Sequence, residues 1–533
     1  MPTPQQNAAI EQTLRYHEET KHHLDRYARS LGYLKWEDQP NPFREYLGSP
    51  RLELPLSRQD EHRSFAELFS SRRGEARALT RQTLGLFFEC SLALSAWKEA
   101  PGARWALRIN PSSGNLHPTE SYALLPPVAG IGPSSGAYHY LSRDHALELR
   151  SRWEGTVAAG GFYLALTSIP WREAWKYGER AFRYCQHDVG HALAAVTFSA
   201  ALLGWKARLH PVASEYVDWL LGLDQPSHPL EMEIPEVLVW IQTDPLQPPF
   251  ALPAAHSALE RFGQPNQLSA GHAAWPLIDE VAAATRELPD PQISPSPRET
   301  RWGDPSPVPC LTPAGRIIRQ RRSAVDFDGD TSLSQAAFLQ ILDQTLPRPH
   351  TPPFDLWEVP ARAHLVLFVH RVTDLAPGLY LWVRNLQHVD ALRGACHSDF
   401  LWTCEQPERC PLFQLERGDL SEFAKGLSCH QDIAADGAFS LGMLTYFEPT
   451  LRARGAHAYR QLFWEAGMIG QTLYLGAEAA GMRGTGIGCY FDDVAHNALG
   501  LKDRTWQSLY HFTVGSPVDD PRLRSAPPYG DRS

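Results

Sequence analysis

The hydrophobic positions of the chain fall into short apolar runs separated by polar turns, with two longer runs that have helical spacing. The long runs, residues 191–205 and 467–481, each predict a buried core helix. Further helical patterns open the chain and occur at residues 64–98 and around Leu339 and Leu342. Short apolar runs predict strands at residues 122–125, 136–140, 146–149, 161–167, 237–241, 366–369, 379–382, 439–445 and 509–514.

A proline-rich stretch separates two such sets of elements and predicts the domain boundaries. For 533 residues, two domains are the natural expectation. We expect an N-terminal helical arm over residues 1–60 and a first domain over 61–245. A Pro-rich linker is expected over 246–309, a second domain over 310–517, and a disordered polar tail over 518–533.

The two halves repeat each other at a constant spacing of 277 residues. The matching positions are Phe162 and Phe439, Ala181 and Ala458, Arg183 and Arg460, Gly190 and Gly467, and Gly204 and Gly481. A constant register over more than forty residues is typical of an internal duplication. Gly136 and Gly378 are only 242 apart, so the second half is expected to carry an insertion of 35 residues.

Composition narrows the partners and the compartment. Lys and Arg total 50 against 60 Asp and Glu, a formal charge of −10, which argues against a nucleic-acid or anionic-membrane surface. The N-terminus has no signal-peptide pattern and no apolar run is long enough to span a bilayer, so we expect a cytoplasmic protein. The eight cysteines form no C-x-x-C pair, and we expect free thiols and no metal site.

One stretch of the first half, residues 108–122, concentrates hydrogen-bonding groups in a turn before an apolar run. Pro111 fixes φ and Gly114 permits positive φ, so the backbone can lie close to a flat ligand. The other candidate binding residues of this loop are Arg108, Ser112, Ser113 and Asn115. On composition alone, an ordinary surface loop contains the same residue types.

The pattern Arg-x-x-Pro-Ser-Ser-Gly-x-Leu-His-Pro-x-Glu-x-Tyr resembles the flavin-contacting loop of the nitroreductase superfamily. Within it, the chain is most similar to the SagB-type azoline dehydrogenases, whose N-terminal arm also carries Tyr-His-x-x-Thr-Lys, as at residues 16–21. The resemblance implies a mixed α+β fold, FMN as the cofactor, and an intertwined dimer with the flavin at the interface. Two fused copies therefore imply an intramolecular pseudo-dimer, whose further dimerisation is left open.

The resemblance also implies that the halves kept complementary parts of one flavin site. The second half carries the phosphate motif Arg321, Arg322, Ser323 and the late Gly-rich loop Gly486, Ile487, Gly488. At the places of these two motifs the first half has only residues 72–74 and 205–209. In place of the first half's loop at Pro111–Asn115, called the Pro-Ser loop below, the second half has residues 349–353. Val325 and Asp326 stand where the family has a further arginine, which Arg319 or Arg522 would replace. We therefore expect one competent site and one degenerate site.

Lys176 and Tyr177 are the candidate catalytic pair. Beside a flavin, a lysine can act as a base when desolvated, and a tyrosine when a positive charge is near. The pair resembles the residues that azoline dehydrogenases use to abstract a proton, and the second half has Ala453 and Arg454 instead. From the residues alone, an exposed helix start with the lysine on the surface is equally compatible. His187 and His191 have the spacing of metal ligands on a helix, but packing is the favoured interpretation.

The sequence thus predicts an FMN-dependent oxidoreductase that acts by hydride transfer at the flavin N5, on an azoline-like or other small-molecule or peptide substrate. One alternative is an NAD(P)H-dependent nitro or quinone reductase. The other is a non-catalytic flavin-binding scaffold of a peptide-modifying complex, favoured by the missing arginine at Val325.

Overall fold

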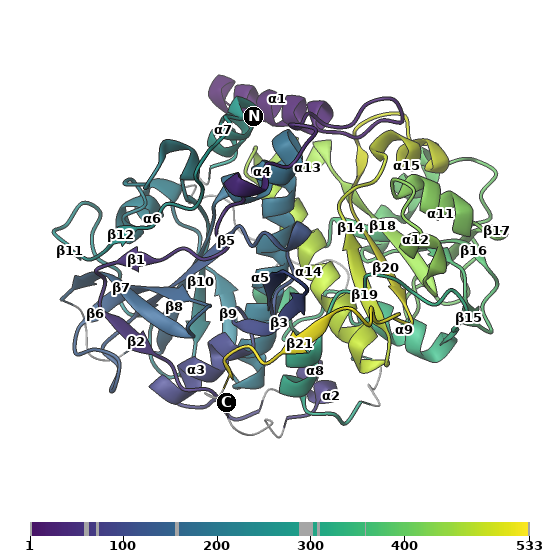
Figure 1. The fold of residues 1–533 in the computed structure, drawn as a ribbon. Coiled ribbons are helices and arrows are strands. Elements are labelled where there is room, and N and C mark those ends of the chain that lie inside the picture. The colour runs from purple at the N-terminus through teal and green to yellow at the C-terminus, as the bar shows by residue number, and fades with distance from the viewer. Residues whose placement is uncertain are drawn as a thin grey trace.

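The computed structural model describes residues 3–57, 63–70, 74–154, 159–286, 302–305, 310–357 and 359–530. Two antiparallel sheets lie on either side of a central pair of long helices, α5 (Ala181–Leu202) and α14 (Ala458–Ala479) (Figure 1). Both helices have 22 residues, and their first residues are 277 positions apart. The fold is therefore mixed α+β, as the sequence predicts.

The first sheet has the strand order β11-β7-β6-β5-β8-β10-β9, and β2 also pairs with β7. Its neighbours are all antiparallel. The strands are β2 (Arg51–Glu53), β5 (Thr119–Leu125), β6 (Ser135–Leu141), β7 (Ala146–Trp153), β8 (Gly161–Ser168), β9 (Lys206–Leu209), β10 (Ile234–Gln242) and β11 (Glu260–Arg261).

The second sheet has the order β17-β16-β14-β18-β20-β19, also antiparallel throughout. Its strands are β14 (Ala363–Val369), β16 (Gly378–Trp382), β17 (Leu412–Arg417), β18 (Phe439–Tyr446), β19 (Arg483–Ile487) and β20 (Trp506–Gly515). In both sheets the last strand of the order follows the long central helix in the chain. The two sheets thus share one strand order and one connection pattern.

The strands alternate between two buried faces, as a period of two requires. In β14, Leu365 and Leu367 face the central core, whereas Val366 and Phe368 belong to a separate cluster on the outer face. The central core contains residues from both halves, among them Val189 of α5 and Met468 of α14. The two halves therefore share one continuous hydrophobic core.

The central helices cross where two glycines meet. A Cβ added to Gly190 would lie 2.8 Å from the Cα of Gly467, and a Cβ added to Gly467 would lie 2.8 Å from the Cα of Gly190. Such a distance is too short for any side chain, so only glycine at both positions permits this close approach. The two glycines that the constant sequence spacing pairs are thus in direct contact in the fold.

Two buried arginines at equivalent positions of the repeat each bind a carboxylate of the opposite half. Arg183 of α5 donates to Asp492 at 2.8 Å, and Arg460 of α14 donates to Glu236 at 2.6 Å. Arg183 also donates to Thr20, the residue that ends α1 (Pro4–Glu19), at 2.9 Å. Arg460 donates at 2.9 Å to the equivalent threonine, Thr285, which ends α7 (Pro276–Ala284).

Smaller elements complete the fold. The additional strands are β1 (Tyr46–Leu47) paired with β12 (Gln264–Pro265), β13 (Leu333–Ser334) paired with β15 (Val372–Thr373), and a three-stranded sheet of β3 (Leu94–Ala100), β4 (Ala103–Arg108) and β21 (Arg524–Ala526). The other helices are α2 (Phe65–Leu68), α3 (Arg81–Glu89), α4 (Pro170–Tyr177), α6 (Ser214–Leu221), α8 (Ala314–Gln320), α9 (Gln335–Asp343), α10 (Val389–Ala395), α11 (Ser421–Leu427), α12 (Ile433–Asp436), α13 (Glu448–Arg454) and α15 (Asp492–Leu499).

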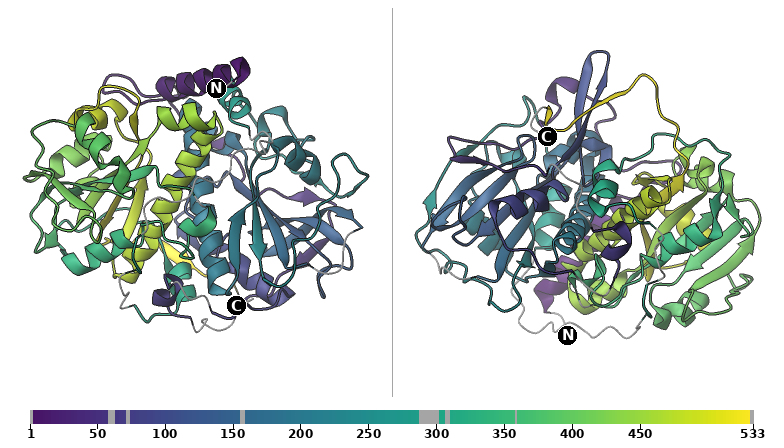
Figure 2. Two further views of the ribbon diagram at one scale, coloured as in Figure 1. Left: turned by 180° about the vertical axis from the view of Figure 1, so that it is seen from behind. Right: turned by 90° about the horizontal axis from the view of Figure 1, so that it is seen from below.

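Three local predictions differ from the structure. The tail is not disordered over 518–530: it crosses to the first half, where β21 pairs with β3 and the Tyr529 hydroxyl donates to the carbonyl of Ser142 at 2.9 Å (Figure 2). The helical region 64–98 is two short helices and a strand. The Pro-rich segment 246–309 contains β11, β12 and α7, so part of it is integral to the fold.

Candidate functional site

The Pro-Ser loop runs from the end of β4 to the start of β5 and makes a single helical turn at Ser113–Asn115. Gly114 has φ 58°, and the loop is braced from within. The Ser112 hydroxyl accepts from the backbone N–H of His117 at 2.8 Å, and the Asn115 amide donates to the carbonyl of Ala106 at 2.9 Å. Pro111 and Ser113 are only partly buried.

Arg108 supports this loop from beneath. Its buried guanidinium donates to the carbonyls of Thr119 at 3.1 Å and Pro42 at 2.6 Å, and burial lowers its pKa. Because these donors are used inside the protein, Arg108 positions the loop backbone in this structure.

The candidate catalytic pair lies against the same loop. Pro170 starts α4, and Gly178, with φ 55°, ends it, so Lys176 and Tyr177 occupy its last turn. A Cβ on Gly114 would lie 2.6 Å from the Tyr177 hydroxyl and 3.2 Å from the Lys176 ammonium nitrogen. Residues that are far apart in the sequence therefore meet at Gly114.

The two members of the pair differ in their surroundings. Lys176 is exposed, and its Nζ lies 5.2 Å from the centre of the Tyr177 ring. Burial, followed by the nearby Glu173 carboxyl, raises the pKa of Tyr177 well above its ordinary value. Tyr177 therefore keeps its proton at neutral pH and can serve as a hydrogen-bond donor. Lys176 remains the candidate base, but it is exposed here and would have to be desolvated by the bound flavin and substrate.

The second half contributes Arg321 to the base of the loop. Arg321 directly follows α8, and its Nη2 donates to the carbonyls of Arg108 and Ile109, both at 2.9 Å. Its Nε is buried and has no partner among the described residues. Arg322 donates to the carbonyl of Ser95 at 2.8 Å. The arginine motif of one half is thus in direct contact with the Pro-Ser loop of the other.

Ser323 and the Gly-rich segment meet through a tyrosine. The Ser323 hydroxyl lies 2.8 Å from the hydroxyl of Tyr474, which accepts from the N–H of Gly486 at 2.9 Å. Gly486 and the buried Ile487 belong to β19 and not to a loop, contrary to the sequence prediction. Gly486 is required because a Cβ there would collide with the hydroxyl of Tyr510.

Gly488 connects the second half to α5. Its carbonyl accepts from the Tyr184 hydroxyl at 3.1 Å and from Arg180 at 3.2 Å, and a Cβ on Gly488 would collide with the Tyr184 ring. Tyr184 in turn packs edge-on against Tyr177, with ring centres 4.6 Å apart. The late Gly-rich segment, the catalytic pair and the Pro-Ser loop therefore form one continuous set of contacts.

Two buried carboxyls beneath the loop were missed by the sequence analysis. Asp188 Oδ1 accepts from the N–H of Ser113 at 3.2 Å, and Glu173 Oε1 accepts from the Ser112 hydroxyl at 3.5 Å. Their other oxygens are buried and have no partner among the described residues. Burial raises both pKa values, that of Asp188 to about 7. An acidic residue inside a wholly buried helix was the available signal.

This carboxyl pair should make stability depend on pH. The pKa of Asp188 is about 7 in the folded protein, and an unfolded aspartate has a pKa of about 4. Protonated Asp188 therefore contributes its full stabilisation of the fold below about pH 4, and this contribution is lost as the pH rises through about 7. Asp188→Asn retains the acceptor for Ser113 and cannot ionise. We expect native and variant proteins to melt alike at about pH 4 and below, and the variant to melt a few degrees higher at pH 8. Parallel melting curves across this range would contradict the assignment.

The two candidate replacements for the missing arginine lie elsewhere. Arg522 is exposed and pairs with Asp520 at 2.7 Å, and Arg319 reaches Glu89 at 3.4 Å. Arg72 and Arg73, of the first-half equivalent motif, lie outside the described residues. Val325 is 76% exposed, so it adds no polar group to the site.

The histidines of α5 contact the second half. His187 stacks on the Tyr510 ring at 4.1 Å, and its Nε2 lies 3.0 Å from the carbonyl of Leu509. His191 Nε2 lies 3.1 Å from the Tyr510 hydroxyl. Across the described part of the chain, no group of three or more His, Cys, Asp or Glu residues is arranged to hold a metal ion.

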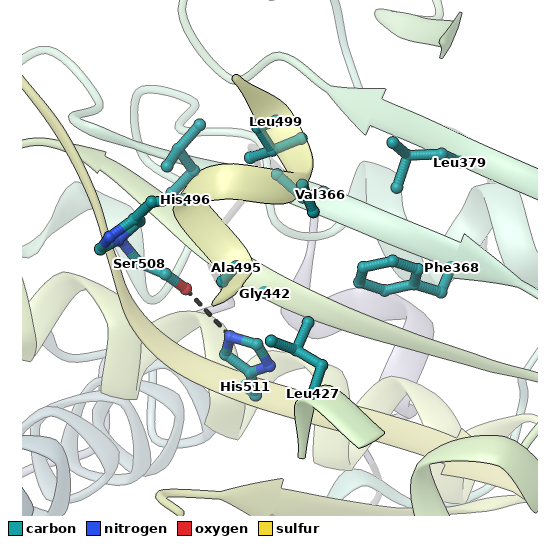
Figure 3. Close-up of a pocket in the computed structure, with 12 residues that line it drawn as sticks. Val366, Phe368, Leu379, Leu427, Gly442, Ala495, His496, Leu499, Ser508 and His511 are labelled. Atoms are coloured by element: carbon teal, nitrogen blue, oxygen red, sulfur yellow. Dashed lines mark hydrogen bonds between the residues drawn. The ribbon is translucent and has the colours of Figure 1, made fainter. Parts of the chain in front are cut away.

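A separate cavity lies on the outer face of the second sheet (Figure 3). Its volume of about 20 Å³ is room for about one water molecule. Its lining is apolar except for His496, Ser508 and His511, and the Ser508 hydroxyl lies 3.0 Å from His511 Nε2. None of the sequence-predicted site residues lines this cavity.

Within the described residues, no helix has the length and apolar character to span a bilayer.

The donor set around the loop fits a flavin mononucleotide in its chemistry. A buried guanidinium with an unpaired Nε and the Ser323 hydroxyl suit a phosphate, because charged donors bind phosphate oxygens strongly. The exposed backbone of Gly114 lets a flat ring approach closely.

Comparisons with known proteins identify the type of fold. Residues 318–516 match the model of the nitroreductase family, so this part of the chain is homologous to oxidoreductases that typically bind a flavin. A protein from Anabaena variabilis assigned as a nitroreductase is 21% identical and superposes with a TM-score of 0.69, covering 95% of this chain and 99% of that chain. The described chain therefore has a nitroreductase-like α+β fold.

Shorter matches involve one half of the chain. A protein from Ralstonia eutropha assigned as a nitroreductase is 14% identical, covers 44% of this chain and 99% of that chain, and has a TM-score of 0.28. A chain of the E. coli microcin synthetase McbBCD complex is 18% identical, covers 44% and 93%, and has a TM-score of 0.27. These low scores carry no argument about function. No curated protein matches the chain.

Proposed function

We propose that the protein is an FMN-dependent oxidoreductase with a single cofactor site built from both halves. The contact between Arg321 of the second half and the carbonyls of Arg108 and Ile109 in the first half carries this proposal. It joins the phosphate motif of one half to the Pro-Ser loop of the other. This is the complementary arrangement that the sequence comparison of the two halves implies.

We further propose that residues 61–245 and 310–517 form an intramolecular pseudo-dimer. In a two-fold interface, residue i of one copy contacts residue j of the other and the reverse contact also occurs; equivalent residues meet on the axis. The mutual approach of Gly190 and Gly467 fits such an axis. Arg183 and Arg460, which are equivalent in the repeat, each pair with a carboxylate of the opposite half, Asp492 and Glu236, which supports it.

The opposite site is proposed to be degenerate. At the place of the Gly-rich segment, the first half has β9, with Lys206, Ala207 and Arg208. Because none of these residues is glycine, their side chains keep the backbone away from a flat ring. The shared chain thus retains one set of binding residues.

When bound, FMN supplies two-electron redox chemistry by exchanging a hydride at its N5. The residues of the chain have three tasks. Arg321 and Ser323 would hold the phosphate, the Ser112–Asn115 backbone would contact the ring system, and Tyr177, which keeps its proton, would donate a hydrogen bond. Lys176 removes the proton from the substrate carbon adjacent to the one that loses hydride. Oxidation of an azoline ring to an azole has this stoichiometry, one hydride and one proton, and we propose this substrate class.

The amount of flavin bound per chain tests the proposal. We expect the purified protein, or the protein reconstituted with FMN, to hold one FMN per chain, measured from the flavin absorbance after acid release. Two per chain would overturn the degenerate site. No binding, even with FMN in excess, would overturn the oxidoreductase assignment in favour of a scaffold.

A further inference from the structure

Two cysteines from distant parts of the second half face each other. The Sγ atoms of Cys429 and Cys489 are 2.8 Å apart, and both residues are partly exposed. A sulfur–sulfur bond has a length of about 2.05 Å, so an approach of about 0.8 Å would join them. Cys429 lies just after α11, and Cys489 directly follows Gly488.

The backbone around both cysteines is held together on either side of the sulfurs. The Gln431 amide donates to the carbonyl of Ser428 at 2.7 Å and to that of Cys489 at 3.1 Å. The N–H of Phe491 donates to the carbonyl of Leu427 at 3.0 Å. Cys429 has φ 53°, a conformation uncommon for a residue with a side chain and maintained only by its surroundings. The segment is therefore built to present Cys429 to Cys489.

The groups facing Cys489 favour its thiolate. His22 Nδ1 accepts from the N–H of Ala28 at 2.9 Å, so neutral His22 carries its proton on Nε2 and can donate to the sulfur. Arg180 is fixed beside it through the carbonyl of Gly488 at 3.2 Å. The hydrogen bond between the two sulfurs, together with His22 and Arg180, lowers the pKa of Cys489. Other titratable groups near the pair are Tyr27, which faces Cys429, and Tyr184 and Tyr177, which lie on the side of Cys489.

The other described cysteines differ in burial and in their neighbours: Cys310 is partly exposed, and Cys90 lies 3.7 Å from Arg319 Nη1 but is buried. Cys90 and Cys185 are buried, and burial raises the pKa of Cys396, Cys404 and Cys410. Cys404 and Cys410 are partly exposed and six residues apart, and they provide an internal control. Nucleophilic reactivity requires a thiolate that solvent can reach, so Cys489 should react faster than the buried Cys90 and Cys185 and than Cys396, Cys404 and Cys410.

We propose that Cys429 and Cys489 form a thiol–disulfide exchange site whose substrates are low-molecular-weight disulfides. The Cys489 thiolate attacks one sulfur of the disulfide, forms a mixed disulfide and releases the first thiolate. Cys429 then loses its proton and attacks the Cys489 sulfur, which forms the Cys429–Cys489 bond and releases the second thiolate. The protein loses two electrons and two protons, and one disulfide becomes two thiols. The exchange itself requires no flavin, although Cys489 directly follows Gly488 of the proposed cofactor site.

Oxidised glutathione is a suitable probe. The reduced full-length protein is incubated with it at pH 6.5, quenched with acid, alkylated, digested and analysed by mass spectrometry. We expect a Cys429–Cys489 cross-link, with Cys404 and Cys410 still free. Cys489 should react at least about tenfold faster than Cys404. In Cys429→Ser, the glutathione adduct should accumulate on Cys489, and in Cys489→Ser no adduct should form on Cys429 in the same time.

His22→Asn separates the exchange site from a passive contact. The variant should shift the pH midpoint for alkylation of Cys489 by iodoacetamide upward and leave that of Cys404 unchanged. A Cys489 that reacts no faster than Cys404, with no cross-link at any glutathione ratio, would overturn the proposal.

Discussion

Arg321→Ala should bind FMN at least tenfold more weakly than the native protein. A hydrogen bond to a charged group contributes about 1.5–3 kcal/mol, which corresponds to about a tenfold to 150-fold change in affinity. Arg321 also donates to the carbonyls of Arg108 and Ile109, so its removal leaves the base of the Pro-Ser loop without two hydrogen bonds. Titration of flavin-free protein with FMN, followed by quenching of flavin fluorescence, measures the effect.

Two variants make this result specific. Arg316 is exposed on the same short helix, so Arg316→Ala should bind FMN as the native protein does. Arg321→Lys keeps the charge but loses the planar fork that pairs with phosphate oxygens and carbonyls, so it should have an intermediate affinity. Native affinity in a correctly folded Arg321→Ala protein would remove Arg321 from the phosphate site.

Periodic apolar runs predicted the elements that form the central core. The runs at 161–167 and 439–445 became β8 and β18, because such residues bury both faces of a sheet. The second core helix was predicted from residue 467, yet α14 starts at Ala458. Its first turns contain Arg460 and Glu465, which can be buried because they form ion pairs with Glu236 and Arg384, respectively. A buried ion pair between distant residues leaves no local apolar pattern.

Elements whose partners are distant could not be predicted from local sequence. The tail reads as polar and unstructured, but β21 is stabilised by backbone pairing with β3 and by Tyr529. Backbone hydrogen bonds to another strand carry no signature in composition. The same holds for β3, whose residues were read as the end of a helix.

The candidate site shows a similar division. Motif resemblance named loops from both halves, and the structure brings Gly114, Lys176 and Tyr177 together. The motif resemblance did not identify Tyr184 and Tyr474, whose hydroxyls bind the Gly-rich segment. An aromatic residue in an apolar helix is predicted to be a core residue. Their hydroxyl hydrogen bonds depend on the packing of one half on the other, which no local pattern records.

Lys176→Ala should retain FMN and lose about 10²- to 10⁴-fold in the rate of substrate oxidation, the range that a general base typically contributes. Lys176 is exposed beside Gly114 and makes no hydrogen bond in the described structure that holds the loop, so the fold and the cofactor site should remain intact. The rate is measured anaerobically, as bleaching of the visible flavin absorbance after mixing with an azoline-containing peptide.

The donor of the hydride supplies the decisive control. A reduced nicotinamide gives up its hydride without losing a proton from a neighbouring carbon, so Lys176→Ala should slow bleaching by the azoline and leave bleaching by the nicotinamide unchanged. Lys176→Arg retains the charge but cannot act as a base near neutral pH, and it should behave like the alanine variant.

Tyr177→Phe removes only a hydrogen-bond donor, so it should reduce the rate of azoline oxidation less than Lys176→Ala does. Equal rates for native and Lys176→Ala proteins on the azoline would exclude Lys176 as the base, whereas equal losses with both donors would indicate a role in positioning the flavin.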